Sequence, residues 1–111
     1  MRLQSHIWVS AFIRKEQGDG AWAAPIRKGS PEAGTIFISC NHLDGNWSLY
    51  APLPQALATG DEGIGRRFEC VIDHGKEEAV KLYLEKQMRF DSDCWIIETE
   101  RREGIPSFMG D

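Results

Sequence analysis

Apolar and polar residues are spaced along this chain in patterns that predict two helices. Residues 76–90, KEEAVKLYLEKQMRF, place an apolar residue every three or four positions, with charged residues on the opposite face. Residues 6–17 fit a helix with a continuous polar face, capped by Ser5 and followed by Gly18. The same residues also fit an alternating strand. The helix is favoured because its polar face is continuous, and the strand stays open as the alternative.

Short segments rich in β-branched and aromatic residues are predicted as strands at 21–28, 35–41, 47–50, 66–72 and 94–100. Pro25 has no backbone donor, so the first strand is expected at a sheet edge. The second, TIFISCN, is almost wholly apolar and is expected at the centre. The fourth and fifth, joined by the 76–90 helix, are interpreted as a parallel crossover. The predicted fold class is α+β: an antiparallel or mixed sheet with the 76–90 helix packed on one face.

Residues 29–34, GSPEAG, are predicted to form one helical turn between two strands. Ser30 suits the N-cap position, and Pro31 suits the first helical position. Gly34 is expected to end the turn with a positive φ. Further along, residues 55–65 are predicted to form a glycine-rich mobile loop.

The length of 111 residues indicates a single domain, assigned to 1–100, with 101–111 as a loose tail. The formal net charge of −4 counts against general nucleic-acid binding, which requires a basic face. Cys40, Cys70 and Cys94 form an odd set without a CxxC pair, so we expect reduced thiols and a cytoplasmic protein. No segment approaches the roughly 20 apolar residues that a membrane span needs.

The turn at 29–34 is the first candidate site. Two cations precede it, and free N–H groups at the start of a helical turn can bind a phosphate or carboxylate. Two further arginines would join this patch if the 66–72 strand lies near. The candidate anion patch is Arg27, Lys28, Gly29, Ser30, Gly34, Arg66 and Arg67. The alternative is a well-capped turn with solvated charges, and the GxxxxGK[ST] spacing of nucleotide-binding loops is absent.

Three other groups of residues carry the right types for function. They are Cys40, His42, Cys70 and His74; Asp91, Asp93, Glu98 and Glu100; and Trp8, Trp22, Trp47 and Trp95. The first suits a nucleophile pair or a metal site but has no orienting third group, and buried thiols are the simpler interpretation. The second suits Mg²⁺ or Ca²⁺ but lacks EF-hand spacing, and solvated carboxylates are simpler. The tryptophans suit a core or an interface, and Trp22 is expected to be partly exposed.

Several segments, in this order, resemble a small alphaproteobacterial family known as Domain of Unknown Function 1491. They are IWVSAFIRK (7–15), IRKGSPEAG (26–34), LDG (43–45), LYAPLP (49–54), RRFE (66–69) and RFDSDCWIIETE (89–100). The resemblance covers nearly the whole chain. It implies a small soluble bacterial protein and implies no activity, cofactor or catalytic residue.

The sequence favours a small interaction module without catalytic activity, because it contains no complete catalytic constellation. No cofactor is expected. The expected partner is another protein or a second copy of the chain, with Trp22 as the candidate interface residue. Nucleic acid and membrane are not expected as partners. The alternative function is binding, or turnover, of a small anionic ligand at the 27–34 turn.

Overall fold

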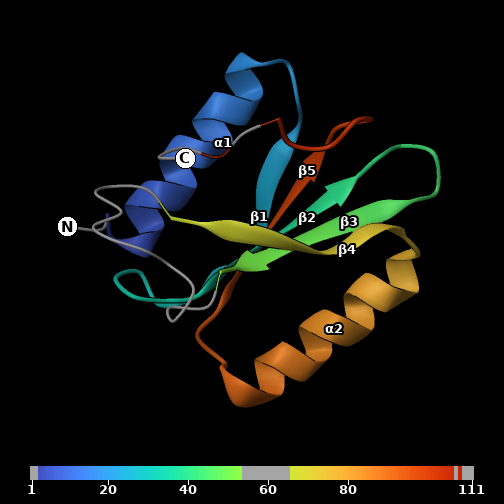
Figure 1. Ribbon diagram of the computed structural model, residues 1–111. Coiled ribbons are helices and arrows are strands. Elements are labelled where there is room, and N and C mark those ends of the chain that lie inside the picture. Colours follow the sequence, from blue (N-terminus) through green and yellow to red (C-terminus); the bar gives the residue numbers. More distant parts are fainter. Residues whose placement is uncertain (1–2, 54–65, 107, 109–111) are drawn as a thin grey trace.

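The computed structural model describes residues 3–53, 66–106 and 108, so the predicted loop at 55–65 lies outside them. Within the described part, two helices and a five-stranded sheet confirm the predicted α+β class (Figure 1). In chain order they are α1 (Ser5–Gly18), β1 (Ala23–Arg27), β2 (Ile36–Asn41), β3 (Trp47–Pro52), β4 (Phe68–Gly75), α2 (Glu77–Phe90) and β5 (Trp95–Glu100). The segment that fitted both helix and strand is therefore the helix α1. Neither helix is long and apolar enough to cross a membrane in the described residues.

All five strands form one mixed sheet in the order β1-β5-β2-β3-β4. β2 and β5 run parallel, and every other neighbouring pair is antiparallel. The edge position of β1 and the central position of β2 were both predicted. The interpretation of β4 and β5 as neighbours was wrong. They run in the same direction, but β3 and the apolar β2 lie between them, so α2 connects strands three positions apart in the sheet.

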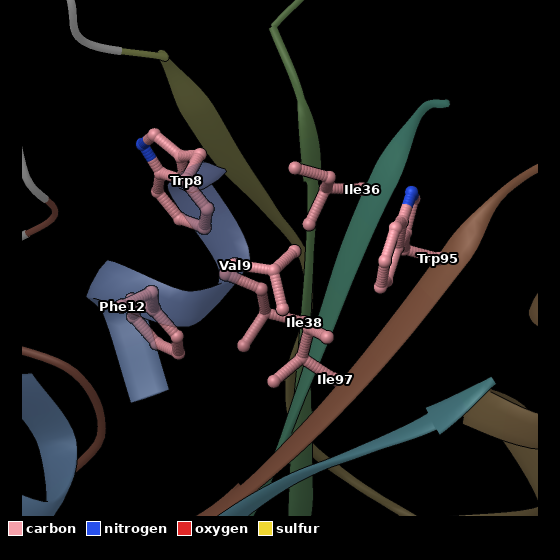
Figure 2. Packing of buried hydrophobic residues seen from close by; sticks show 7 residues of the cluster. All are labelled: Trp8, Val9, Phe12, Ile36, Ile38, Trp95 and Ile97. Carbon is pink, nitrogen blue, oxygen red and sulfur yellow. The ribbon is translucent and has the colours of Figure 1, made fainter. Parts of the chain in front are cut away.

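α1 covers one face of the sheet (Figure 2). Its Trp8, Val9 and Phe12 point toward isoleucines of β2 and toward β5, and the two aromatic rings stack with centroids 5.2 Å apart. All three side chains are almost fully buried. Burial of an apolar side chain of this size contributes about 1.5–3 kcal/mol, so this cluster is a major part of the attachment of α1.

α2 covers the opposite face, mainly over β3 and β4 (Figure 1). Its Val80 and Leu84 are buried against Phe37, Leu49 and Ile96. These two residues lie four positions apart, as the sequence pattern predicted. The two helices thus lie on different faces and over different halves of the sheet.

The start of α1 differs from the sequence-based expectation. Ser5 is the first helical residue rather than the cap, and its Oγ donates to the Gly34 carbonyl at 2.6 Å. The free amides of the helix start are satisfied by the neighbouring turn, because Ser5 N donates to Glu32 O and His6 N to Pro31 O. The turn therefore caps α1 from outside the helix.

The turn itself closes as predicted, with Gly34 N donating to Ser30 O at 3.2 Å. The expected positive φ at Gly34 was wrong. A Cβ there would lie 2.5 Å from the Asp93 carbonyl oxygen and 2.8 Å from the Trp95 ring. Glycine is required because the start of β5 passes too close for any side chain.

The side chains of β4 do not alternate regularly between the two faces of the sheet. Leu49 pairs with Ile72 and Tyr50 with Cys70, so Val71 is an extra residue in the ladder. Such a bulge rotates the following side chains. Val71 and Ile72 accordingly both pack toward the α2 side of the sheet.

Residues 101–106 and 108, expected as part of a loose tail, contact the α1 side. Phe108 stacks on Phe68 with centroids 4.6 Å apart and also meets Phe12 and Tyr50. This segment lies over the half of that face that α1 leaves open, where β3 and β4 lie.

Candidate functional site

Several groups of the predicted anion patch form hydrogen bonds with the backbone before β5 and are therefore not free for a ligand. Arg27 Nη2 donates to the Ser92 carbonyl at 2.5 Å, while its Nε is buried without a hydrogen-bond partner among the described residues. The Ser30 amide donates to Asp93 O at 2.9 Å. A Cβ on Gly29 would lie 2.0 Å from the same oxygen. The amide that a bound anion would use therefore holds the start of β5.

The two arginines after the loop take different positions. Arg66 is buried, and its Nη2 donates to Leu3 O at 2.9 Å and Ser5 Oγ at 3.2 Å. It is linked to the turn through Ser5, whose hydroxyl donates to the Gly34 carbonyl. Lys28 and Arg67 are exposed. A role for these residues in binding an anion stays a prediction.

Arg66 also lines a hollow of about 450 Å³ between β2, β3, β4 and α2. Thr35, Tyr83 and Gln87 add polar groups, and Phe37 is part of its apolar wall. A volume in this range suits a small ligand. Glu69 lies on the same lining and opposes an anion there.

His42 is fully buried and ties the β2–β3 connection to the segment after β5. Its Nδ1 lies 2.8 Å from the Arg101 carbonyl, which can only accept, so Nδ1 donates this bond. Its Nε2 lies 2.7 Å from Ser48 Oγ. Ser48 is buried and also accepts the His74 N–H at 3.1 Å, so this serine–histidine pair is a tether with no open face for a substrate.

The predicted cysteine–histidine set does not converge on one point. His42 and His74 stack with ring centroids 3.9 Å apart, and the described residues hold no group of three metal-ligating side chains. Cys40 is fully buried, and burial raises the pKa of its thiol to about 11. Cys70 is exposed. The four acidic residues predicted as a cation site also form no such group among the described residues.

A buried ion pair that the sequence did not reveal joins α1 to the end of β5. Glu16 is fully buried, and its carboxylate accepts from Arg101 Nε at 2.9 Å, Arg101 Nη2 at 2.7 Å and Thr99 Oγ1 at 2.8 Å. Arg101 also reaches Asp19 at 2.7 Å. The side-chain hydrogen bond to Glu16 is the main cause that raises the pKa of Arg101, and the hydrogen bond to Asp19 raises it further. The sequence did not indicate that Glu16 is buried, because Glu16 follows Lys15 in a helical turn whose residues are mostly polar.

An open groove lies on the α2 side of the sheet, over the half that α2 does not cover. α2 forms one wall with Val80, Leu84 and Met88, and Ile96 and Ile26 from β5 and β1 form the other. Its volume is about 230 Å³, and Ile26 is 57% exposed. Nothing in the described residues packs over it. On the other face, by contrast, residues 101–106 and 108 lie over the half that α1 leaves open.

The rim of this groove is acidic. Glu77, Glu85 and Glu98 line it together with Lys81 as the one cation. Lys81 lies 3.8 Å from Glu77, so that pair is neutralised. Burial is the main cause that raises the pKa of Glu98, and the charges of Glu100 and Glu77 raise it further.

The tryptophans divide between core and groove. Trp8 and Trp95 are buried, Trp47 lines the groove, and Trp22 is 48% exposed as expected. The Glu100 amide donates to the Trp22 carbonyl at 3.0 Å, which extends the β1–β5 pairing by one residue. By strand alternation Trp22 lies on the same face as Ala24 and the groove. Its role at an interface stays a prediction.

Comparisons with known proteins agree over nearly the whole chain. Residues 3–109 match the family model for a protein of unknown function, DUF1491. The solution structure of protein Atu0922 from A. tumefaciens is 40% identical, covers 90% of this chain and 86% of its own, and superimposes with a TM-score of 0.78. A crystal structure of a DUF1491 family protein from Caulobacter crescentus CB15 is 29% identical, with 92% and 89% covered and a TM-score of 0.74. An NMR structure of a DUF1491 family protein from the same organism is 30% identical, with 98% and 94% covered and a TM-score of 0.75. Among the curated proteins, no relative matches.

Proposed function

The chain belongs to the DUF1491 family, and we propose that it is a protein-interaction module whose docking site is the groove between α2 and β1. The observation that carries this proposal is the uneven covering of the sheet. On the α1 side, residues 101–106 and 108 lie over the half that the helix leaves open. On the α2 side, the half that α2 leaves open lies over β1 and β5, and nothing in the described residues packs over it. A partner segment would complete that layer.

The surface around the groove is of the kind that partners bury. Ile26 and Trp22 are both about half exposed, and both belong to the edge strand or the residue before it. Large apolar side chains exposed on one surface favour association, and tryptophan contributes strongly when an interface buries it. The groove continues along one side of α2 from Glu77 to Met88. This length suits a peptide segment.

The free thiols support a cytoplasmic site of action. Cys40, Cys70 and Cys94 are unpaired in the structure. Unpaired cysteines persist in a reducing compartment. A partner for this module is therefore sought among proteins of the cytoplasm.

The proposal is tested with two matched variants. Each replaces one exposed side chain of leucine size with aspartate, one inside the groove and one outside it. Ile26→Asp alters the groove, and Leu82→Asp alters an exposed position of α2 that is not part of the groove lining. Both positions are more than half exposed, so both variants should fold, which circular dichroism checks. Each is used with the wild-type chain to capture partners from an extract of the native cells.

The expected result is a protein retained by the wild type and by Leu82→Asp and lost with Ile26→Asp. A partner retained equally by all three proteins binds elsewhere and contradicts the proposal. So does an extract from which the wild type retains nothing specific.

A further inference from the structure

We infer that the segment bound in the groove is a basic amphipathic helix of another protein. This inference rests on the proposed function and adds the chemistry of the partner. It follows from the size of the groove, from the charges on its rim and from the state of the neighbouring sheet edge.

The groove is too small for a typical small-molecule ligand. Its volume of about 230 Å³ lies below the roughly 300–1,000 Å³ of sites that bury a whole drug-sized molecule. It has room for a few apolar side chains presented by a backbone that remains outside. An amphipathic helix presents such anchors at positions i, i+4 and i+7, which is a common mode of recognition in apolar grooves.

The rim carries uncompensated negative charge. Glu77 is neutralised by Lys81, whereas Glu85 and Glu98 have no cation within ion-pair distance among the described residues. Glu98 is partly buried, and the carboxylates of Glu100 and Glu77 act on it from β5 and α2. A lysine or arginine on the edge of the bound helix would relieve this repulsion, and an acidic side chain would increase it.

The edge strand favours a helix over an added strand. The Glu100 amide bonds the Trp22 carbonyl, so Ala24 also faces β5 and Pro25 faces outward. Pro25 thus removes an amide from the outer edge of β1. The ladder is also irregular between Pro25 and Arg27. An incoming strand would lack a donor and a regular register here.

A second copy of this chain is a poor occupant. A symmetric dimer places the same patch of both copies together, so Glu85 and Glu98 of one copy would face an acidic rim. The chain as a whole also has a net charge of −4. Charge complementarity therefore points to a different, basic partner.

Two designed peptides test the inference. Both have the length of α2, 14 residues, with leucines at helical spacing on one face. One carries lysine on both flanks of the leucine face, and the other carries glutamate at the same positions. Each peptide is titrated with the intact chain by calorimetry, at low salt and again in about 1 M salt, where the Debye length falls to roughly 3 Å.

The lysine peptide is expected to bind about tenfold more tightly than the glutamate peptide, because two rim pairs change from attraction to repulsion. The difference should shrink at high salt. The double variant Glu85→Gln/Glu98→Gln should remove most of it, while Glu78→Gln, exposed on α2 away from the groove, should leave it unchanged.

Equal binding of the two peptides, or tighter binding of the glutamate peptide, contradicts a basic partner but not the groove as the docking site. If neither peptide binds but capture of a protein from the extract still requires Ile26, the bound segment is not an amphipathic helix. The groove then remains the docking site. A chain that dimerises in light scattering, with the dimer lost in Ile26→Asp, assigns the groove to a second copy instead. Loss of the Ile26 dependence itself contradicts the proposed function.

Discussion

Arg101 connects three parts of the molecule through its side chain and backbone. Its guanidinium binds Glu16 and Asp19 at the end of α1, its amide donates to the carbonyl of Asn41, the last residue of β2, and its carbonyl accepts from His42. Each contact bridges residues at least 59 positions apart in the sequence. A residue that reads as one of two arginines in a tail therefore fixes α1 against the ends of the two parallel strands.

Replacing Glu16 tests the weight of this connection. Glu16→Gln keeps the size of the side chain but leaves Arg101 without its buried counter-charge. Breaking a buried ion pair costs about 3–5 kcal/mol. The lower end is expected because Arg101 is 17% exposed and keeps Asp19. Urea denaturation should thus give a free energy of unfolding lower by about 3 kcal/mol. Glu78→Gln is the exposed control, and an equal effect in both variants would contradict the account.

The three thiols should differ in reactivity. Thiol reagents attack the thiolate, so access and pKa both govern the rate. Cys40 and Cys94 are fully buried, and burial raises the pKa of Cys40 to about 11. The pKa of Cys70 is also raised by burial of its sulfur, but the residue is exposed. A chromogenic disulfide reagent should label one thiol of the native protein rapidly, and Cys70→Ser should remove that phase. Rapid labelling of two or more thiols would contradict the observed burial.

At the scale of single elements, the sequence predicted those whose pattern is set locally. α2 follows from its apolar spacing, β2 from its unbroken apolar run, and the edge position of β1 from Pro25. The turn at 29–34 was also predicted, but for the wrong reason at Gly34. Its glycine is required by the approach of β5, which is more than 50 residues away in sequence and leaves no local signal.

The other glycine of this turn gives an element-scale test. Gly29→Ala would place a Cβ 2.0 Å from the backbone oxygen of Asp93, which cannot move without shifting the start of β5. Overpacking of this kind costs about 1–3 kcal/mol. Thermal unfolding should show the variant destabilised by about 2 kcal/mol.

Gly18→Ala is the matched control, because nothing lies within 4 Å of a Cβ there and Gly18 is helical. Alanine in a helix is favoured over glycine by up to about 1 kcal/mol, so this variant should be as stable as the wild type or more so. A destabilised Gly18→Ala with an unaffected Gly29→Ala would contradict the close approach.

At the scale of the whole molecule, the offset of the two helices creates the candidate site. α1 and α2 lie over different halves of the sheet, and the C-terminal segment fills only one of the two remaining spaces (Figure 1). The sequence could not predict this groove, because Ile26, Glu98 and the α2 stripe meet only through strand order. Of the residues on this surface, only Trp22 was predicted to be exposed, because it lies on the predicted edge strand.

Binding to the groove should depend on pH through Glu98. Its pKa is raised above the ordinary value of 4.5 by burial and by the carboxylates of Glu100 and Glu77; Lys81 and Glu85 also line the groove from α2. A cationic partner favours the ionised form, so at pH below this raised pKa binding must expel a proton. Affinity for the lysine peptide should therefore rise as pH increases through the pKa of Glu98. Calorimetry should find this dependence reduced in Glu98→Gln, and an unchanged dependence would assign it to other groups.

The most direct test of the docking groove is amide chemical-shift mapping by NMR of the isotope-labelled chain with the lysine peptide. Shifts should be concentrated at Ile26, Glu98 and the Leu84–Met88 side of α2, with little change in the hollow lined by Phe37 and Arg66. Shifts concentrated around Arg66 and Tyr83 would contradict the groove as the docking site and direct attention to that hollow. An absence of shifts at the groove in the presence of saturating peptide would contradict it equally.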